Sequence, residues 1–109
     1  MQRVLFICSA NRLRSPTAEQ VFSQYPGIEA SSAGLSHDAV ERLTPEHLDG
    51  IDTIFVMEQA HKAKISRHFR RYIKSAKIIC LDIPDQYGFM QPELIALLKA
   101  RVAPHLRFA

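Results

Sequence analysis

A short apolar run, a polar loop and a helical pattern follow one another at the beginning of the chain. Residues 4–7 are rich in β-branched and aromatic side chains, which is typical of a buried strand. The Ser15-Pro16 pair that follows the loop predicts a helix, with Ser15 as its N-cap and Pro16 at its first helical position. We therefore expect Cys8 and Arg14 to lie on a loop that joins a strand to a helix.

This loop has the composition of an anion site. The N–H groups of such a loop and of the first helical turn have no partners within the helix, and they converge with the positive end of the helix dipole. The same donors stabilise the thiolate form of Cys8, and the planar guanidinium of Arg14 suits a tetrahedral oxyanion. A thiolate nucleophile, an anion site and an arginine together indicate phosphate chemistry.

The order of residues in the loop resembles that of the low-molecular-weight protein tyrosine phosphatase family. Five residues separate Cys8 from Arg14, and Asn11, Ser15-Pro16 and Glu19 lie where the family has them. Three later segments extend the resemblance over most of the chain, namely residues 32–34, 54–57 and 85–87, the last near the family's Asp-Pro-Tyr loop.

The resemblance implies a role for each residue of the loop. Cys8 is the nucleophile that forms a phosphocysteine intermediate, Arg14 holds the phosphoryl oxygens, and Asp85 is the general acid. Asn11 keeps the loop in a left-handed conformation, and Ser32 braces it. The other residues assigned by the resemblance are the phosphate-binding Ser9, Ala10, Arg12, Leu13 and Ser15, and Tyr87 as an aromatic wall of the substrate pocket.

Three of these roles have alternatives. The hydroxyl of Ser15 bonds the cysteine sulfur, as in the family, or caps the helix, or does both. Asp82 competes with Asp85 as general acid, and we favour Asp85 because it belongs to the loop rather than to the end of a strand. Tyr87 is alternatively an exposed loop residue.

Two departures from the family pattern bear on substrate choice. The family usually has a small apolar residue and a second cysteine before the arginine, whereas this loop has Arg12 and Leu13. The charge of Arg12 predicts a preference for substrates with further negative charge. Between Gly34 and Ile54 there is no room for the longer segment that in the family contributes an aromatic wall and a bracing histidine. We therefore expect a shallower pocket.

The rest of the chain predicts alternating strands and helices. Further strands are expected at residues 28–33, 52–57 and 77–81, longer helices at 15–24, 59–69 and from 92 onward, and short helices at 38–43 and 44–50. Such alternation is typical of an α/β fold with three layers, in which helices cover both faces of a four-stranded parallel sheet. The resemblance implies the strand order 2-1-3-4, which places the Cys8 loop in the crevice where the connections diverge.

Composition indicates the class of protein. With 109 residues, of which 47% are hydrophobic and 23% charged, we expect a single domain over residues 1–109. Its apolar runs are short, so we expect neither a membrane span nor a secretory signal. We therefore expect a cytoplasmic location.

The cysteines and histidines do not indicate a metal site. Cys80 lies in an apolar run and is expected to be buried. The five histidines lack the spacing of ligands, and we expect neither a metal nor another cofactor.

Basic residues concentrate in one segment. Residues 61–77 contain half of the 14 lysines and arginines and no acidic residue. This segment is either a contact face for an acidic partner or nucleic acid, or a solvated helix face. We favour the solvated face, and consider nucleic acid unlikely, because aromatic side chains are not regularly interleaved with the charges.

Three functions are compatible with these features. The expected one is a cysteine-dependent protein tyrosine phosphatase that acts on phosphorylated proteins or small aryl phosphates, and phosphoarginine stays open as an alternative to phosphotyrosine. An arsenate reductase on the same fold requires further cysteines to relay a disulfide, for which Cys80 is poorly placed. A weakly catalytic module that binds phosphoproteins is supported by Gln86, which replaces the family's proline.

Overall fold

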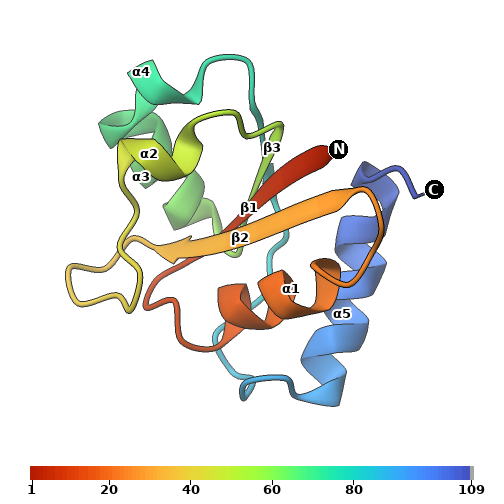
Figure 1. Cartoon of the computed structure of the whole chain (residues 1–109). Helices are drawn as coiled ribbons and strands as arrows, with labels where there is room; N and C mark the ends of the chain where they lie inside the picture. Colours follow the sequence, from red (N-terminus) through yellow and green to blue (C-terminus); the bar gives the residue numbers. More distant parts are fainter. Residues whose placement is uncertain (109) are drawn as a thin grey trace.

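A central parallel sheet organises the chain, of which the computed structural model describes residues 1–108. Its strands are β1 (Gln2–Cys8), β2 (Ile28–Gly34), β3 (Thr53–Val56) and β4 (Lys77–Cys80). They are hydrogen-bonded in the order β2-β1-β3-β4, and every neighbouring pair is parallel (Figure 1). The predicted α/β fold and its strand order are confirmed.

Helices cover both faces of this sheet (Figure 1). One face carries α1 (Arg14–Phe22) and α5 (Pro92–Val102), which a short 3₁₀ turn (Ala103–His105) follows. The other face carries α2 (Pro45–Leu48), α3 (Gln59–His68) and α4 (Arg70–Ile73). None of the helices within residues 1–108 has the length and apolar character needed to cross a membrane.

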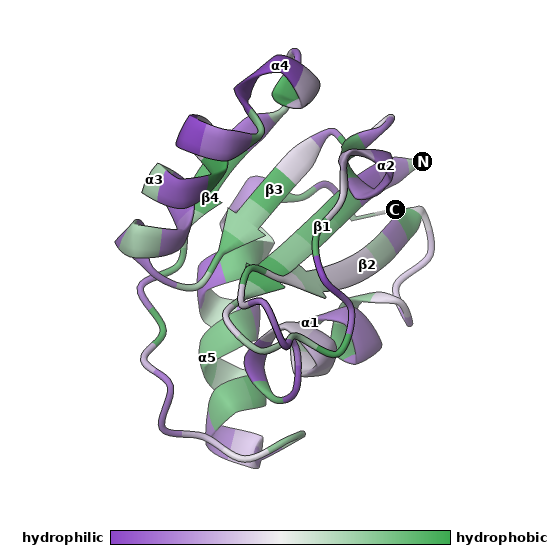
Figure 2. Cartoon of the chain, turned by 90° about the vertical axis from the view of Figure 1, so that its left-hand side faces the viewer, coloured by the Kyte–Doolittle hydropathy of each residue, from purple (hydrophilic) through white to green (hydrophobic). Residues whose placement is uncertain are grey.

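The central strand β1 is buried on both faces because its side chains alternate between two apolar clusters. Val4, Phe6 and Cys8 belong to the cluster beneath α1 and α5, whereas Leu5 and Ile7 belong to the cluster beneath α3. Figure 2 shows these hydrophobic strands in the middle and the hydrophilic surface of α3 and α4 outside them. Cys8 therefore ends a rigid strand and has only 3% of its surface exposed.

Two local predictions about helices are wrong. The α1 helix begins at Arg14, with Leu13 at the N-cap position and no side-chain cap, so Ser15 is not the cap. Pro16 is tolerated inside the first turn because the N–H it lacks would have no helical partner there. Residues 38–43 form turns instead of a helix, because Glu41 and Leu43 pair with Gly34 and the Val40 N–H bonds the Ala10 carbonyl.

The prediction that Cys80 is buried is also wrong. It lies on β4, which is an edge strand and has only one neighbour in the sheet. The side chain is half-buried, and its thiol donates a hydrogen bond to Asp82 Oδ1 at 3.3 Å. Partial burial raises the pKa of the Cys80 thiol.

Candidate active site

The loop after Cys8 lies where the parallel strands end, and the segment after β2 holds it in place. Cys8 pairs with Gly34 in the sheet, and the N–H groups of Leu35 and Ser36 donate to the carbonyls of Cys8 and Ser9 at 3.1 and 2.9 Å. A Cβ atom on Gly34 would lie 2.6 Å from the Ser9 carbonyl oxygen. This close approach explains the glycine.

Asn11 links the loop to β2 and α1. Its backbone is left-handed, with φ of 55°, a conformation that asparagine tolerates better than most residues. Its side-chain Nδ2 donates to Ser15 Oγ at 2.9 Å and to Ser32 Oγ at 3.0 Å. Ser32 in turn donates to Glu19 Oε1 at 2.5 Å. The structure thus places Ser32 against Asn11, as the family resemblance implies.

These hydrogen bonds determine which hydrogen-bonding groups remain available to the sulfur of Cys8. Glu19 accepts the only hydroxyl hydrogen of Ser32, and the two amide hydrogens of Asn11 go to the two serine oxygens. The hydroxyl hydrogen of Ser15 then has two acceptors within reach, Cys8 Sγ at 3.0 Å and the Ala33 carbonyl at 3.5 Å, of which the sulfur is the nearer. The Asn11 N–H donates to the same sulfur at 3.3 Å. The Ser15 hydroxyl and the Asn11 N–H therefore both face the sulfur of Cys8.

Arg14 is held by groups from the segments that follow β3 and β4. Its side chain is 2% exposed, and Nη1 donates to Glu58 Oε2 at 2.5 Å and to the Ile83 carbonyl at 2.8 Å. Its Nε lies 3.6 Å from Asp85 Oδ1. The guanidinium plane is thus held between Glu58 and the loop that contains Asp85.

The two candidate acids lie in different surroundings. Asp85 is exposed and faces the guanidinium of Arg14. The side chain of Asp82 accepts the hydrogen bond from Cys80, and its carbonyl accepts one from Arg101 at 2.5 Å. Of the two carboxylates, that of Asp85 therefore lies at Arg14, whereas that of Asp82 lies at Cys80.

The remaining predicted residues lie around the loop. Arg12 and Leu13 are exposed at its tip, whereas Ser9 and Ala10 are half-buried. Tyr87 is half-buried and packs against the apolar cluster beneath α1 and α5, so it is not a freely exposed tyrosine. Among residues 1–108, no group of three histidine, cysteine or acidic side chains is arranged to hold a metal ion.

Two residues that the sequence analysis did not identify contact the loop. Glu58 holds Arg14, and His61 Nε2 lies 2.9 Å from Ser9 Oγ. A bracing histidine was expected to be missing, and α3 supplies one instead. Both residues follow β3 directly, and the carboxyl ends of neighbouring parallel strands meet at one edge of a sheet. Because strands that pair in parallel bring their carboxyl ends together, an acid and a histidine just after β3 could have been predicted to lie near the Cys8 loop.

The protonation of His61 follows from its partners. The Glu58 N–H donates to Nδ1 at 3.1 Å, so in the neutral ring the hydrogen is on Nε2 and is donated to Ser9. Burial lowers the pKa of His61 from the model-compound value of 6.5. The histidine is therefore neutral at pH 7 and braces the loop without adding charge.

Replacing His61 with glutamine is expected to flatten the pH dependence of stability. Below pH 6.5 the unfolded chain binds a proton that the folded chain does not. The free energy of unfolding of the wild type therefore falls as the pH drops, by at most about 1.4 kcal/mol per pH unit from this group. Urea denaturation of both proteins between pH 5 and 7.5 measures the difference. Parallel profiles would contradict a lowered pKa for His61.

Comparison with known proteins shows which family this chain resembles. The model of the family "Low molecular weight phosphotyrosine protein phosphatase" matches residues 3–48, which include Cys8, Arg14 and Ser32. The crystal structure of a low-molecular-weight protein tyrosine phosphatase from T. tengcongensis is 26% identical, with a TM-score of 0.74 over 97% of this chain and all of that one. The resemblance to this family is confirmed.

Other similar proteins are named for different activities. A protein-arginine-phosphatase from Geobacillus stearothermophilus is 30% identical, with 62% of each chain covered, so this chain spans about three fifths of that relative's length. The solved YwlE arginine phosphatase from the same organism has 23% identity, a TM-score of 0.71 and complete coverage of both chains. The tyrosine phosphatase Wzb from Escherichia coli K30, in complex with phosphate, has 21% identity and a TM-score of 0.76, with 95% of each chain covered. These last two show the fold that the family shares.

Proposed function

We propose that this chain is a cysteine-dependent phosphatase that hydrolyses phosphorylated side chains of proteins. The observation that carries the proposal is the surroundings of Cys8, whose sulfur lies 3.0 Å from Ser15 Oγ and accepts a hydrogen bond from the Asn11 N–H at 3.3 Å. A thiolate at the end of a parallel strand, with a buried arginine at the start of the helix that follows, suits attack on a phosphoryl group. The similarity to a family of phosphatases over residues 3–48 is independent support.

In the first step, the sulfur of Cys8 attacks phosphorus as the bond from phosphorus to the leaving oxygen breaks. Asp85, whose carboxyl group lies 3.6 Å from Arg14 Nε, gives its proton to that oxygen. Arg14 and the N–H groups of the loop bind the charge on the equatorial oxygens. The product is a phosphocysteine.

In the second step, water attacks the phosphocysteine and the phosphorus–sulfur bond breaks. The Asp85 carboxylate takes the proton from the water, and the sulfur leaves as a thiolate that accepts the hydroxyl hydrogen of Ser15. A solved YwlE mutant in which serine replaces the active-site cysteine has that serine phosphorylated, which supports an intermediate of this kind here.

Replacing Asp85 with alanine is expected to lower kcat for phenyl phosphate about a hundredfold, because the departing phenolate then lacks a proton donor. The loss should be smaller for p-nitrophenyl phosphate, whose leaving group is more stable as an anion. Asp82→Ala is the matched control, since its carboxylate faces Cys80. Steady-state kinetics on both esters measure the effect, and an equal loss in the two variants would contradict the assignment.

We propose phosphotyrosine as the substrate class, and phosphoarginine is the second candidate. The family description names phosphotyrosine, and the protein-arginine-phosphatase supports the alternative. Release of phosphate from matched peptides that differ only in the phosphorylated residue decides between them. If the wild type hydrolyses neither peptide nor p-nitrophenyl phosphate but still binds phosphate, it is a binding module and the proposed activity is wrong.

Arg12→Ala is expected to reduce the preference for substrates with further negative charge. Arg12 is exposed at the tip of the loop, where its charge attracts acidic groups beside the phosphorylated residue. The ratio of kcat/KM for acidic over neutral phosphopeptides is expected to fall about threefold, because a factor of this size corresponds to the free energy of one exposed ion pair. Repeating the assay at 0.5 M salt should remove the difference. An unchanged ratio at low salt would contradict this role.

A further inference from the structure

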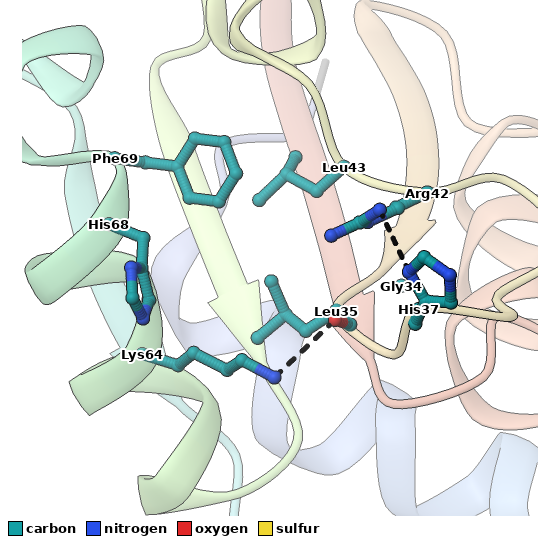
Figure 3. A pocket seen from close by; sticks show the side chains of 8 residues that line it. All are labelled: Gly34, Leu35, His37, Arg42, Leu43, Lys64, His68 and Phe69. Carbon is teal, nitrogen blue, oxygen red and sulfur yellow. Dashed lines mark hydrogen bonds between the residues drawn. The ribbon is translucent and has the colours of Figure 1, made fainter.

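A pocket of about 300 Å³, here called the basic pocket, lies between α3 and the segment that follows β2 (Figure 3). Every residue that lines it is apolar, glycine or basic. They are Gly34, Leu35, His37, Arg42, Leu43, Lys64, His68 and Phe69. The pocket therefore combines an apolar surface with positive charge.

The two permanent cations of the basic pocket have polar neighbours but no counter-ion. Arg42 Nη1 lies 3.2 Å from His37 Nδ1, and Lys64 Nζ lies 3.5 Å from the Leu35 carbonyl. Figure 3 shows both cationic groups pointing into the pocket from opposite sides. Within residues 1–108, the carboxylates that form ion pairs do so with other basic residues. An anion that enters the pocket meets two uncompensated charges.

The basic pocket adjoins the candidate active site through two elements. Leu35, which lines the pocket, donates its N–H to the Cys8 carbonyl at 3.1 Å. On α3, Lys64 lies one turn after His61, which contacts Ser9. A short extended segment of a bound protein can therefore occupy the pocket while its phosphorylated residue occupies the loop.

We propose that the basic pocket binds an acidic segment of the phosphorylated protein substrate. An apolar side chain of that segment packs on Leu35, Leu43 and Phe69, and a neighbouring carboxylate lies between Arg42 and Lys64. The positive charges of Arg42 and Lys64 complement those of an acidic segment. Contacts between opposite charges speed the encounter of two proteins and fix the position of one on the other. The inference rests on the proposed function, since it concerns the same substrate.

Binding can be tested without catalysis. The probes are an unphosphorylated peptide of alternating glutamate and leucine and a matched peptide with glutamine in place of glutamate. In two-dimensional NMR spectra, the acidic peptide is expected to shift the amide signals of Leu35, Arg42, Lys64 and Phe69. Inorganic phosphate is expected to shift those of residues 9–15. The glutamine peptide should bind at least about fivefold more weakly, because it lacks the carboxylates.

Charge-reversal variants localise the effect. Arg42→Glu and Lys64→Glu are expected to weaken binding of the acidic peptide about tenfold each, whereas Arg71→Glu makes the same change of charge on the exposed surface of α4 and should weaken it less than twofold. Circular dichroism and thermal melting verify that the variants are folded. In kinetics, the two pocket variants should lower kcat/KM for an acidic phosphopeptide and leave p-nitrophenyl phosphate unaffected.

Each contrary outcome overturns one identifiable statement. Equal binding of the glutamine peptide, equal effects of Arg71→Glu and Arg42→Glu, or shifts confined to residues 9–15 would overturn the inference about the basic pocket. Tighter binding of single-stranded DNA than of the peptide at the same amides would overturn the choice of partner. Absence of p-nitrophenyl phosphate hydrolysis by the wild type would overturn the proposed function, while the NMR result would still decide whether the pocket binds the peptide.

Discussion

Replacing Cys8 with serine is expected to lower kcat for p-nitrophenyl phosphate by roughly four orders of magnitude or more, because the nucleophile is removed. A serine hydroxyl is un-ionised at neutral pH, so the hydrogen bonds from Ser15 and Asn11 no longer stabilise a reactive anion. The loop itself keeps its backbone donors and Arg14. We therefore expect the variant to bind inorganic phosphate with an affinity within about a factor of ten of the wild type, since the anion contacts persist.

Cys80→Ser is the matched control for this prediction. Cys80 lies on the edge strand β4, and β3 separates it from β1. Its thiol has a raised pKa and stays protonated at neutral pH. Activity of Cys80→Ser should equal that of the wild type. Turnover that survives in Cys8→Ser, or that disappears in Cys80→Ser, would contradict the assignment of the nucleophile.

Replacing Arg14 with lysine is expected to lower kcat by about two to three orders of magnitude, even though the charge is kept. The guanidinium is planar and has donors on two edges, so it can contact Glu58 and the Ile83 carbonyl while it faces the loop. A lysine ammonium is a single point of charge and cannot keep both sets of contacts. Steady-state kinetics with p-nitrophenyl phosphate measure the loss.

Two controls separate this effect from a general loss of charge or fold. Arg12→Lys changes the same side-chain type at an exposed position of the same loop, and it should alter kcat by less than about threefold. Thermal melting tests whether Arg14→Lys, at a site with 2% of its surface exposed, is still folded. A folded Arg14→Lys protein with the kcat of the wild type would show that the planar geometry is not needed.

Local patterns were sufficient to predict the strands and the loop, whereas the order of the strands in the sheet was predicted from the family resemblance. Residues 4–7 are apolar without interruption because β1 is covered on both faces, which is a property of the sequence itself. The spacing from Cys8 to Arg14 and the position of Asn11 likewise depend on the backbone of one loop. The family resemblance added Ser32, which is distant in sequence and adjacent in space.

Contacts between distant segments account for what was missed. Glu58 and His61 reach the loop only because β3 pairs with β1, and no local pattern near either residue indicates Arg14 or Ser9 as its partner. Residues 38–43 have a local preference for helix, but their backbone groups bond Gly34 and Ala10. Ser15 has the chemistry of a helix cap and uses its hydroxyl at Cys8, where a sulfur atom competes with the backbone.

The register of β2 against β1 makes the anion site a reporter of correct folding. Phe6 pairs with Ser32 and Cys8 with Gly34, so a slip of one residue would turn Ser32 to the opposite face of the sheet and bring a side chain against Ser9. Asn11 would then lose its partner, and the loop could not close around phosphate. On the proposed function an anion binds only the properly paired sheet, so we expect phosphate in solution to shift the population of chains toward the native pairing of the first two strands.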